Sequence, residues 1–433
     1  MRRLVIASAI LATLLTTPIG AAAASPTATP APIPTAGPTF PSTATDSARA
    51  TAALSYLLAA QSPDGSIDKS LGETADYIIG AAAAGYDPAT LTGCTAGGTG
   101  ALTFLATASD AATTDAAKTG KTILAVVASG LDPAAFSGRN LVGRLAALYH
   151  AGTGAYGDGS TFAQAFAILA VDASGGTVPP AATAKLAALQ DGDGSWSYGK
   201  APVAAGSGDT NSTAMALMAL DAAGVHSADA TGFAYLVTQQ LADGGFPYQN
   251  STTYGTPASD PDSDSVVLQA LVAVGQDPTS GTWSKGSANV LTSLRASQIN
   301  DGGFYFPGSG ESAFTTSEVP AALAGVPYGA ATHPKAGASV PATGCPNYVP
   351  VASAAASVGA VSSSGAVSST VSSAAASSVT AQPGATAAAS GNSSSSNGNS
   401  SGLDPLVLLL VAVVLILLAG GGLWFYRARS RRR

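Results

Sequence analysis

The chain has 433 residues, 18 of them basic and 25 acidic, with only two cysteines and three histidines. Residues 46–350 carry 11 basic and 24 acidic side chains, a net charge of −13. This acidity argues against nucleic acid or an anionic membrane surface as a partner, and otherwise fits the solubility of a secreted domain. The scattered histidines lack the Cys/His spacing of a zinc site, so we predict no metal and no cofactor.

The N-terminal segment has the pattern of a secretory signal peptide. Arg2 and Arg3 precede the apolar stretch 4–15, and small residues near 20–24 offer cleavage sites. We therefore predict a signal peptide over residues 1–24. The Pro/Thr/Ala tract 25–45 cannot bury a core and is predicted to be a linker.

The C-terminal segment predicts a stalk and a membrane anchor. Residues 351–403 are rich in Ser, Ala and Gly, a composition typical of flexible stalks. Residues 404–426 are long and apolar enough to span a bilayer, and the arginine-rich tail 427–433 follows at once. We expect a single-pass cell-membrane protein with its main domain, residues 46–350, outside the cell and its C-terminus in the cytoplasm.

The main domain is predicted to be all-α. Apolar residues recur at helical spacing, and no stretch has a convincing strand pattern. The predicted helix pairs are 47–61 with 72–85, 97–109 with 113–130, 138–149 with 160–172, 181–190 with 209–224, 229–241 with 262–276, and 285–298 with 313–325.

A Gln-x-x-Asp-Gly turn links helices within this array. It begins at Gln61, Gln190, Gln240 and Gln298, and the last three turns continue into an aromatic residue. The intervals of 50 and 58 positions between the last three glutamines indicate a helical repeat. The second and third pairs lack a clean turn, although Gly154-Ala155-Tyr156 resembles a decayed copy.

These turns resemble the QW-type repeats of the squalene cyclase and prenyltransferase superfamily. The resemblance covers residues 46–330 and implies an (α/α)6 toroid, with six inner helices in a ring, six outer helices around them and a central cavity. Cobalamin carriers of the intrinsic-factor type and complement-type thioester domains share this architecture. The zinc ligands of protein prenyltransferases and the Gly-Cys-Gly-Glu-Gln thioester signature are not recognisable here.

Closure of such a ring would bring its first and last repeats together. Cys94 lies early in the array and Cys345 follows its last helix. We therefore predict a disulfide between them, as a secreted chain allows. The alternative is two free thiols, or a pair too far apart to bridge.

The acidic segment at the start of the fifth inner helix is the sharpest chemical signal. Class II terpenoid cyclases protonate their substrate with the central acid of an Asp-x-Asp-Asp motif, whereas this chain has Asp262-Ser263-Asp264-Ser265. Asp209 and Asn211 occupy the matching place one repeat earlier. We interpret residues 262–265 mainly as helix N-caps, with acid catalysis by Asp262 and Asp264 as the alternative.

Other residues could line a ligand site at the mouth of the ring. The aromatic residues after the turns act either as packing clamps between repeats or as walls of a pocket; inward-facing polar residues on several helices could converge on a ligand. The aromatic candidates are Trp196, Tyr198, Phe246, Tyr248 and Phe304 to Phe306. The polar candidates are Asp76, Gln164, Asp209, Asn211, Asp262, Asp264, Gln269 and Glu318.

The sequence therefore favours a membrane-anchored surface protein that binds a small molecule or a surface polymer at the mouth of the ring. No catalytic motif is complete, so binding is favoured over catalysis. The alternatives are a divergent terpenoid cyclase-like or carbohydrate-active enzyme that uses paired carboxylates, and a purely structural or adhesive head.

Overall fold

The computed structural model describes residues 39–345, apart from 95–97, 113, 253–255, 309 and 333–336. The predicted signal peptide, stalk, membrane span and basic tail lie outside the described residues. Within the described part of the chain, no helix has the length and apolarity needed to cross a bilayer.

Twelve α-helices of the described residues alternate between two layers. The outer helices are α1 (Asp46–Ala60), α3 (Ala101–Ala108), α5 (Leu141–Ala147), α7 (Pro180–Ala187), α9 (Asp229–Gln239) and α11 (Val290–Ala296). The inner helices are α2 (Leu71–Ala83), α4 (Ala116–Ala128), α6 (Thr161–Ala173), α8 (Thr210–Ala222), α10 (Pro261–Ala273) and α12 (Ala313–Leu323). These are the six pairs that the apolar spacing predicts, with ends that differ by a few residues.

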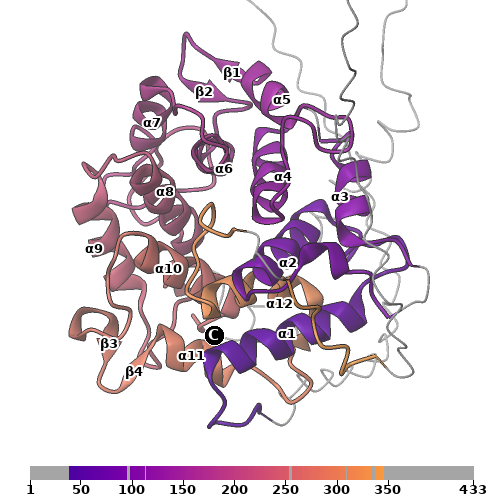
Figure 1. Cartoon of the computed structure of the whole chain (residues 1–433). Coiled ribbons are helices and arrows are strands. Elements are labelled where there is room, and N and C mark those ends of the chain that lie inside the picture. Colours follow the sequence, from indigo (N-terminus) through magenta and orange to yellow (C-terminus); the bar gives the residue numbers. More distant parts are fainter. Residues whose placement is uncertain are drawn as a thin grey trace, which may run out of the picture. The chain divides into compact units, whose positions relative to one another are not determined.

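The inner helices form a closed ring. Each inner helix packs against the next in chain order, and α12 returns to pack against α2. Each outer helix packs against the inner helix that precedes it, so α1 covers α12. Figure 1 shows this progression of colours around the ring, with α11 and α12 beside α1. The predicted all-α toroid is thus the observed architecture of the described residues.

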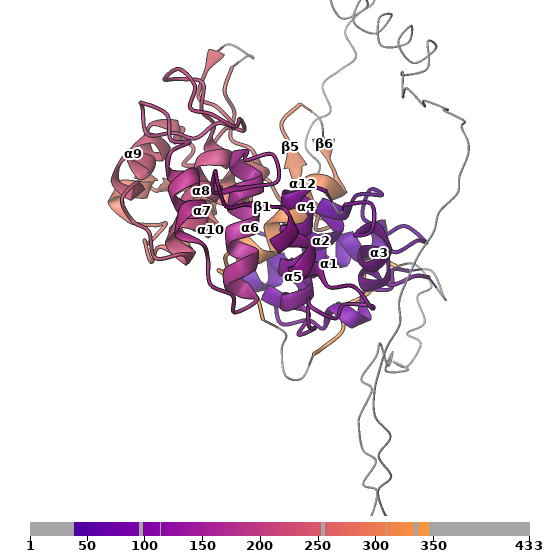
Figure 2. The ribbon, with the colours of Figure 1, turned by 90° about the horizontal axis from the view of Figure 1, so that it is seen from above.

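Short connections complete the ring. Three two-stranded antiparallel ladders also form. They were not predicted from the sequence, because each strand has only two residues. They pair β1 (Tyr149–His150) with β2 (Ala155–Tyr156), β3 (Ser284–Lys285) with β4 (Ala288–Asn289), and β5 (Tyr305–Phe306) with β6 (Gly310–Glu311). Short 3-10 helices cover Pro88–Thr90 and Gly281–Trp283. In Figure 2 the β5–β6 hairpin projects from one side of the ring.

The glutamine of each repeated turn fastens one repeat to the next. The Nε2 of Gln240 donates to Gly244 O at 2.9 Å and to Trp283 O at 2.8 Å. Gln61, Gln190 and Gln298 make the same bond to the carbonyl four residues on, and each reaches a second acceptor near the following outer helix. The turn motif is therefore a structural staple between neighbouring repeats.

Two features of the structure require glycine at this position of the turn. Gly244 has a φ of +86°, a region that L side chains rarely adopt. A Cβ added there would lie 2.2 Å from the backbone nitrogen of Asn289 in the next repeat. The turn can therefore touch the next outer helix only because it has no side chain at this position.

The last staple closes the ring onto the first helix. Gln298 Nε2 donates to Arg49 O at 2.9 Å, and the buried guanidinium of Arg49 donates to Gln298 Oε1 at 3.2 Å. Arg295 also binds both carboxylate oxygens of Asp46 at 2.7 Å. The predicted disulfide is confirmed: Cys94 and Cys345 are bonded, with their Cα atoms 5.3 Å apart. The start and end of the domain are thus joined by hydrogen bonds, an ion pair and a covalent bond.

Helix α10 starts earlier than the sequence analysis expected. Its N-cap is Asp260, whose carboxylate accepts from Ser263 N at 2.8 Å, and Pro261 is its first residue. The prediction that the caps lie within residues 262–265 is therefore wrong. Proline at the first helical position needs no N–H partner, and it fixes the start one residue after Asp260.

Candidate functional site

In five inner helices, the side chain of the fourth residue accepts a backbone hydrogen bond from the chain just after the preceding turn. We call this fourth residue the clamp. Thr74, Thr213 and Thr316 each accept, through Oγ1, the N–H of the residue that follows their turn. Asp264 Oδ1 does the same for Phe246 N at 2.6 Å, and Gln164 Oε1 accepts from Tyr156 N. Asp264 and Gln164 therefore have a structural role, and their predicted role in ligand binding finds no support here.

Gln164 also explains the decayed third turn. Its Nε2 donates to Gly154 O and Ala182 O, both at 3.1 Å. These are the bonds that the turn glutamine makes elsewhere, supplied here from the inner helix. The staple is thus kept although the turn sequence is lost.

The aromatic residues after the turns divide into two groups. Trp196, Phe246 and Phe304 are fully buried and pack between repeats, as the clamp interpretation predicts. Trp196 also donates from Nε1 to Leu186 O at 2.8 Å. Tyr248 is instead half-exposed, so among these four residues it alone is available to a ligand.

The sixth residue of every inner helix has the same register and faces the inside of the ring. These residues are Asp76, Lys121, Phe166, Met215, Val266 and Glu318. Side chains from separate parts of the ring meet there: Lys121 on α4 binds Asp76 on α2. Tyr328, which follows α12, contacts both Asp76 and the Phe166 ring on α6. The interior therefore has an acidic arc and, on α6 and α8, an apolar arc.

A polar network holds part of the acidic arc. Lys121 Nζ lies 2.5 Å from Asp76 Oδ2, and the Tyr328 hydroxyl donates to Asp76 Oδ1 at 2.6 Å. The Lys121 ammonium also lies 5.3 Å from the centre of the Phe166 ring. Burial by itself would lower the pKa of Lys121, but Asp76 and Glu318 raise it overall. Asp76, predicted as a site residue, is thus already paired inside the ring.

Two carboxyls of the interior lack such a partner. Burial, together with the charges of Asp262, Asp76 and Glu73, raises the pKa of Glu318 well above its usual range. Burial and the charge of Asp260 raise the pKa of Asp262 to about 7, against a hydrogen bond from Thr315 that lowers it. Both groups therefore hold a proton in mildly acidic conditions.

Asp262 and Asp264 do not form a catalytic pair. The Asp262 carboxyl interacts with Thr315 on α12 and with Asp76 on α2, inside the ring. The Asp264 carboxyl meets Phe246 N and Ser293 on the outer helix α11. Since the two side chains leave α10 on different faces, they cannot act on one substrate from opposite sides.

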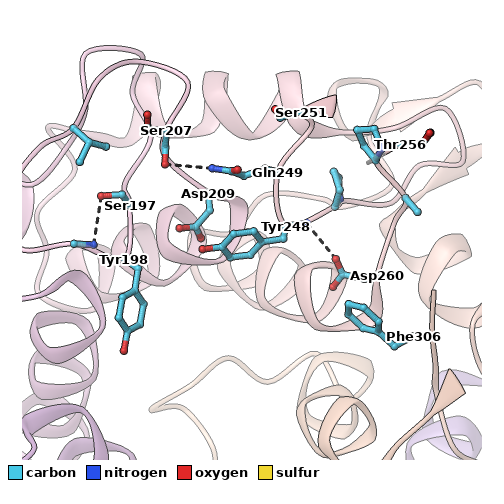
Figure 3. A pocket seen from close by; sticks show the side chains of 15 residues that line it. Ser197, Tyr198, Ser207, Asp209, Tyr248, Gln249, Ser251, Thr256, Asp260 and Phe306 are labelled. Atoms are coloured by element: carbon cyan, nitrogen blue, oxygen red, sulfur yellow. Dashed lines mark hydrogen bonds between the residues drawn. The ribbon is translucent and has the colours of Figure 1, made fainter. Parts of the chain in front are cut away.

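A pocket lies at the mouth of the ring, in the loops before α8 and α10. It has a volume of about 770 Å³. Its lining includes Tyr198, Tyr248 and Phe306, with polar groups from Ser207, Gln249, Ser251 and Thr256. Figure 3 shows Tyr248 beside Asp209 and the Tyr198 ring hanging from the neighbouring loop. Tyr198 is 67% exposed and Tyr248 48%, so their ring faces are open to a ligand.

The two acids of this pocket are helix caps. Asp209 accepts from Ser212 N at 2.7 Å and from Ser212 Oγ at 2.8 Å, and Tyr248 adds a side-chain hydrogen bond. Asp260 accepts from Ser263 and from Tyr248 N at 3.1 Å. Burial nevertheless raises the pKa of both carboxyls. They support the pocket wall rather than offering a free carboxylate.

Three residues that shape these sites were not predicted from the sequence. Asp260 belongs to the mouth pocket, whereas Lys121 and Tyr328 belong to the interior network. Tyr198, one of the aromatic candidates after the turns, lines the mouth pocket. Asn211 and Gln269, which were predicted as site residues, each keep a buried side-chain oxygen without a hydrogen-bond partner. Asp260 was detectable from the Pro that follows it; Tyr328 carries no pattern, because it lies in the connection after α12.

No protein-family model and no curated protein matches the sequence. MstE, a type II terpene cyclase from Scytonema solved with geranylgeranyl dihydroxybenzoate, is 16% identical and has a TM-score of 0.44. The match covers 65% of this chain and 97% of the cyclase. An unsaturated glucuronyl hydrolase from Bacillus sp. GL1 is 11% identical over 64% of this chain and 94% of its own, with a TM-score of 0.45. Both proteins are α/α toroids, as the repeated turns implied for this chain, and the likeness concerns the fold alone.

Proposed function

We propose that the protein binds a neutral polysaccharide at the mouth of its ring. The observation that carries this proposal is the pocket of about 770 Å³, in which half-exposed tyrosine rings stand among hydroxyl and amide groups. Aromatic faces offer flat apolar surface to a sugar ring, and the surrounding polar groups match its hydroxyls. The net charge of −13 of residues 46–350 disfavours an anionic polymer.

The aromatic surface extends beyond one side chain. Tyr198 packs against Phe162, with ring centres 5.4 Å apart, and Phe306 lines the pocket beside Tyr248. Exposed aromatic rings that gather in one place are typical of an interaction site. Several rings along one pocket suit an extended chain of sugar units better than a single small molecule.

Retention of the full-length protein on insoluble neutral polysaccharides tests this proposal. We expect Tyr198→Ala to reduce affinity at least tenfold, about 1.4 kcal/mol, because it removes the most exposed ring of the pocket. Phe314→Ala is the matched control: Phe314 is 46% exposed but does not line the pocket. Equal retention of both variants, or no retention of the wild type on any neutral polysaccharide, would refute the proposal.

We further propose that this binding takes place at the cell surface. The predicted signal peptide 1–24 and membrane span 404–426 support export and anchoring. The Cys94–Cys345 disulfide suits an oxidising compartment. Protease added to intact cells should remove the domain and leave a short membrane-bound C-terminal fragment. Complete protection in intact cells, with cleavage only after lysis, would contradict surface display.

A further inference from the structure

The interior of the ring holds more carboxyls than cations. Among the charged groups of the described residues that act on Glu318, three are carboxyls, those of Asp262, Asp76 and Glu73, and one is a cation, Lys121. Lys121 is already bound to Asp76 and lies near two aromatic rings. Asp262, Glu318 and Glu73 are thus left without a basic partner of their own.

Unpartnered polar atoms on several inner helices give an independent signal. Glu73 Oε2, Asn211 Oδ1, Asp262 Oδ1 and Gln269 Oε1 are buried and have no hydrogen-bond partner. All four are acceptors, and two of them belong to neutral amides. Gln269 is 1% exposed and follows Asp262 by seven residues, so it lies on the same face of α10. Buried acceptors normally find a donor, so these four oxygens favour a group rich in N–H or O–H bonds.

The opposite arc of the interior is apolar. Phe162, Phe166, Met215 and Met218 occupy the inward positions of α6 and α8. Phe166 meets the Tyr328 ring edge to face at 5.7 Å, which places both arcs around one interior. A ligand that bridges the arcs needs a donor-rich cation at one end and an apolar body at the other.

Solvent reaches this interior from the mouth. Glu73, Lys121 and Glu318 are only partly buried, and so are Phe162 and Asn211 at the second positions of their helices. The second residue of α12, Phe314, is exposed. The acidic arc is therefore accessible without unfolding of the ring.

We propose that the ring interior binds a small organic amine, with its ammonium group between Asp262, Glu318 and Glu73 and its apolar body against Phe162, Phe166 and Met215. An ammonium ion supplies three donors and one positive charge, which are what the acceptors and the carboxyls lack. Aromatic and thioether side chains suit the remainder of such a ligand. This site is separate from the mouth pocket, so the two proposals succeed or fail independently.

Amine binding should release protons. Asp262 holds a proton in the free protein at pH 6.5, because burial and the charge of Asp260 raise its pKa to about 7. Burial and the charges of Asp262, Asp76 and Glu73 also raise the pKa of Glu318, against the opposing charge of Lys121. An ammonium ion stays charged at this pH and stabilises the ionised carboxylates. Neutral ligands lack this effect.

Calorimetric titration of the full-length protein at pH 6.5 tests the proposal. The probes are 2-phenylethylamine and n-octylamine, each compared with the alcohol of the same skeleton. We expect at least one amine to bind tenfold or more tightly than its alcohol. Two buffers of different ionisation enthalpy should show the release of a proton. If neither amine outcompetes its alcohol, or if binding moves no proton, the interior holds water only and the proposal is wrong.

Variants locate the site. Glu318→Gln and Asp262→Asn should each weaken amine binding at least tenfold, whereas Asp172→Asn, the same change at an exposed residue, should leave it unaltered. Unchanged affinity in both interior variants would overturn the assignment. If either variant fails to fold, the pH dependence of wild-type amine binding decides: affinity that does not change from pH 5 to pH 8 is incompatible with the site.

Discussion

The starts of α8 and α10 are two versions of one design. In each, an N-cap aspartate, Asp209 or Asp260, accepts from both the N–H and the hydroxyl of a serine three residues later. The fourth residue, Thr213 or Asp264, clamps the chain after the preceding turn. The second residue, Asn211 or Asp262, faces the interior instead.

The differences between the two starts separate structure from function. The clamp accepts the same N–H whether it is a threonine or an aspartate, but a buried carboxyl there must stay neutral: burial raises the pKa of Asp264 well above its usual value. The second position carries no backbone bond, so it is free to differ. An acid at the clamp is thus tolerated by the fold, whereas an acid at the second position is available to the interior.

Replacing the threonine clamp of α8 by an aspartate should have the largest effect on stability. Thr213→Asp places a carboxyl in a fully buried site that lacks the Ser293 partner of Asp264, so we expect a loss of about 2–4 kcal/mol at pH 8. The loss should be smaller at pH 5, where the carboxyl is more readily protonated. Urea unfolding at the two pH values measures this. Thr213→Val serves as the pH-independent control, and an equal loss for Asp at both pH values would contradict the argument.

Removing the shared caps should have a smaller and more uniform effect. Asp209→Ala and Asp260→Ala should each lower the free energy of unfolding by about 1–2 kcal/mol. The two losses should be similar, because Asp260 also accepts from Tyr248 N and Asp209 also has a side-chain hydrogen bond with Tyr248. Thermal unfolding compares them with Asp115→Ala, an exposed cap on α4, for which we expect the smallest loss. A larger loss at Asp115 than at the two buried caps would speak against this ranking.

Replacing the aspartate clamp of α10 by a threonine should change the pH dependence of the unfolding free energy more than its size. The folded pKa of Asp264 lies above its unfolded value of 3.8, so the wild type loses stability as the pH rises from about 4 towards the folded pKa. Asp264→Thr keeps the acceptor and removes the titrating group. We expect the variant to be as stable as the wild type at pH 8, or up to about 1 kcal/mol more stable, with a flatter curve between pH 5 and 8. An unchanged slope would show that Asp264 is ionised in the folded protein.

Giving the second residue of α10 the amide found at the second residue of α8 should have the smallest effect on stability. Asp262→Asn gives α10 the amide that α8 carries at Asn211, and it breaks no backbone bond. We expect a change below about 0.5 kcal/mol at pH 3, where the carboxyl is mostly protonated in both the folded and the unfolded protein. Because the folded pKa of Asp262 is about 7, the wild type loses stability from about pH 4 to pH 7, and the variant should lack this loss. Carboxyl NMR of the two proteins gives the same titration directly; a wild-type midpoint near 4 would refute it.

The ring could be predicted from the sequence because its determinants are local. The turn glutamines, the glycine after each aspartate and the apolar spacing all act over a few residues, and they also implied the Cys94–Cys345 pair through ring closure. The interior could not be predicted. Lys121 and Asp76 meet only because neighbouring inner helices share a register. One residue of error at a helix start changes which face a side chain occupies.

The mouth pocket shows the same limit. Tyr198, Tyr248 and Phe306 were candidates because each closely follows a repeated turn, but whether each ring lines the pocket depends on the paths of irregular loops. Loop paths follow from contacts that are distant in sequence, such as Gln249 Nε2 donating to Gly208 O at 2.6 Å. The repeated turns therefore indicated which aromatic residues could line a pocket, but not which of their side chains stay exposed.

The bond between Cys94 and Cys345 also has a mechanical consequence. A pull on the C-terminal end of the chain enters the domain at Cys345 and passes through the disulfide to Cys94. The backbone between these two residues, which spans 251 positions and carries both the mouth pocket and most of the interior, lies in a closed loop outside that line of tension. Pulling can therefore not unravel the repeats one by one from their C-terminal end, and the load falls on the first helix pair.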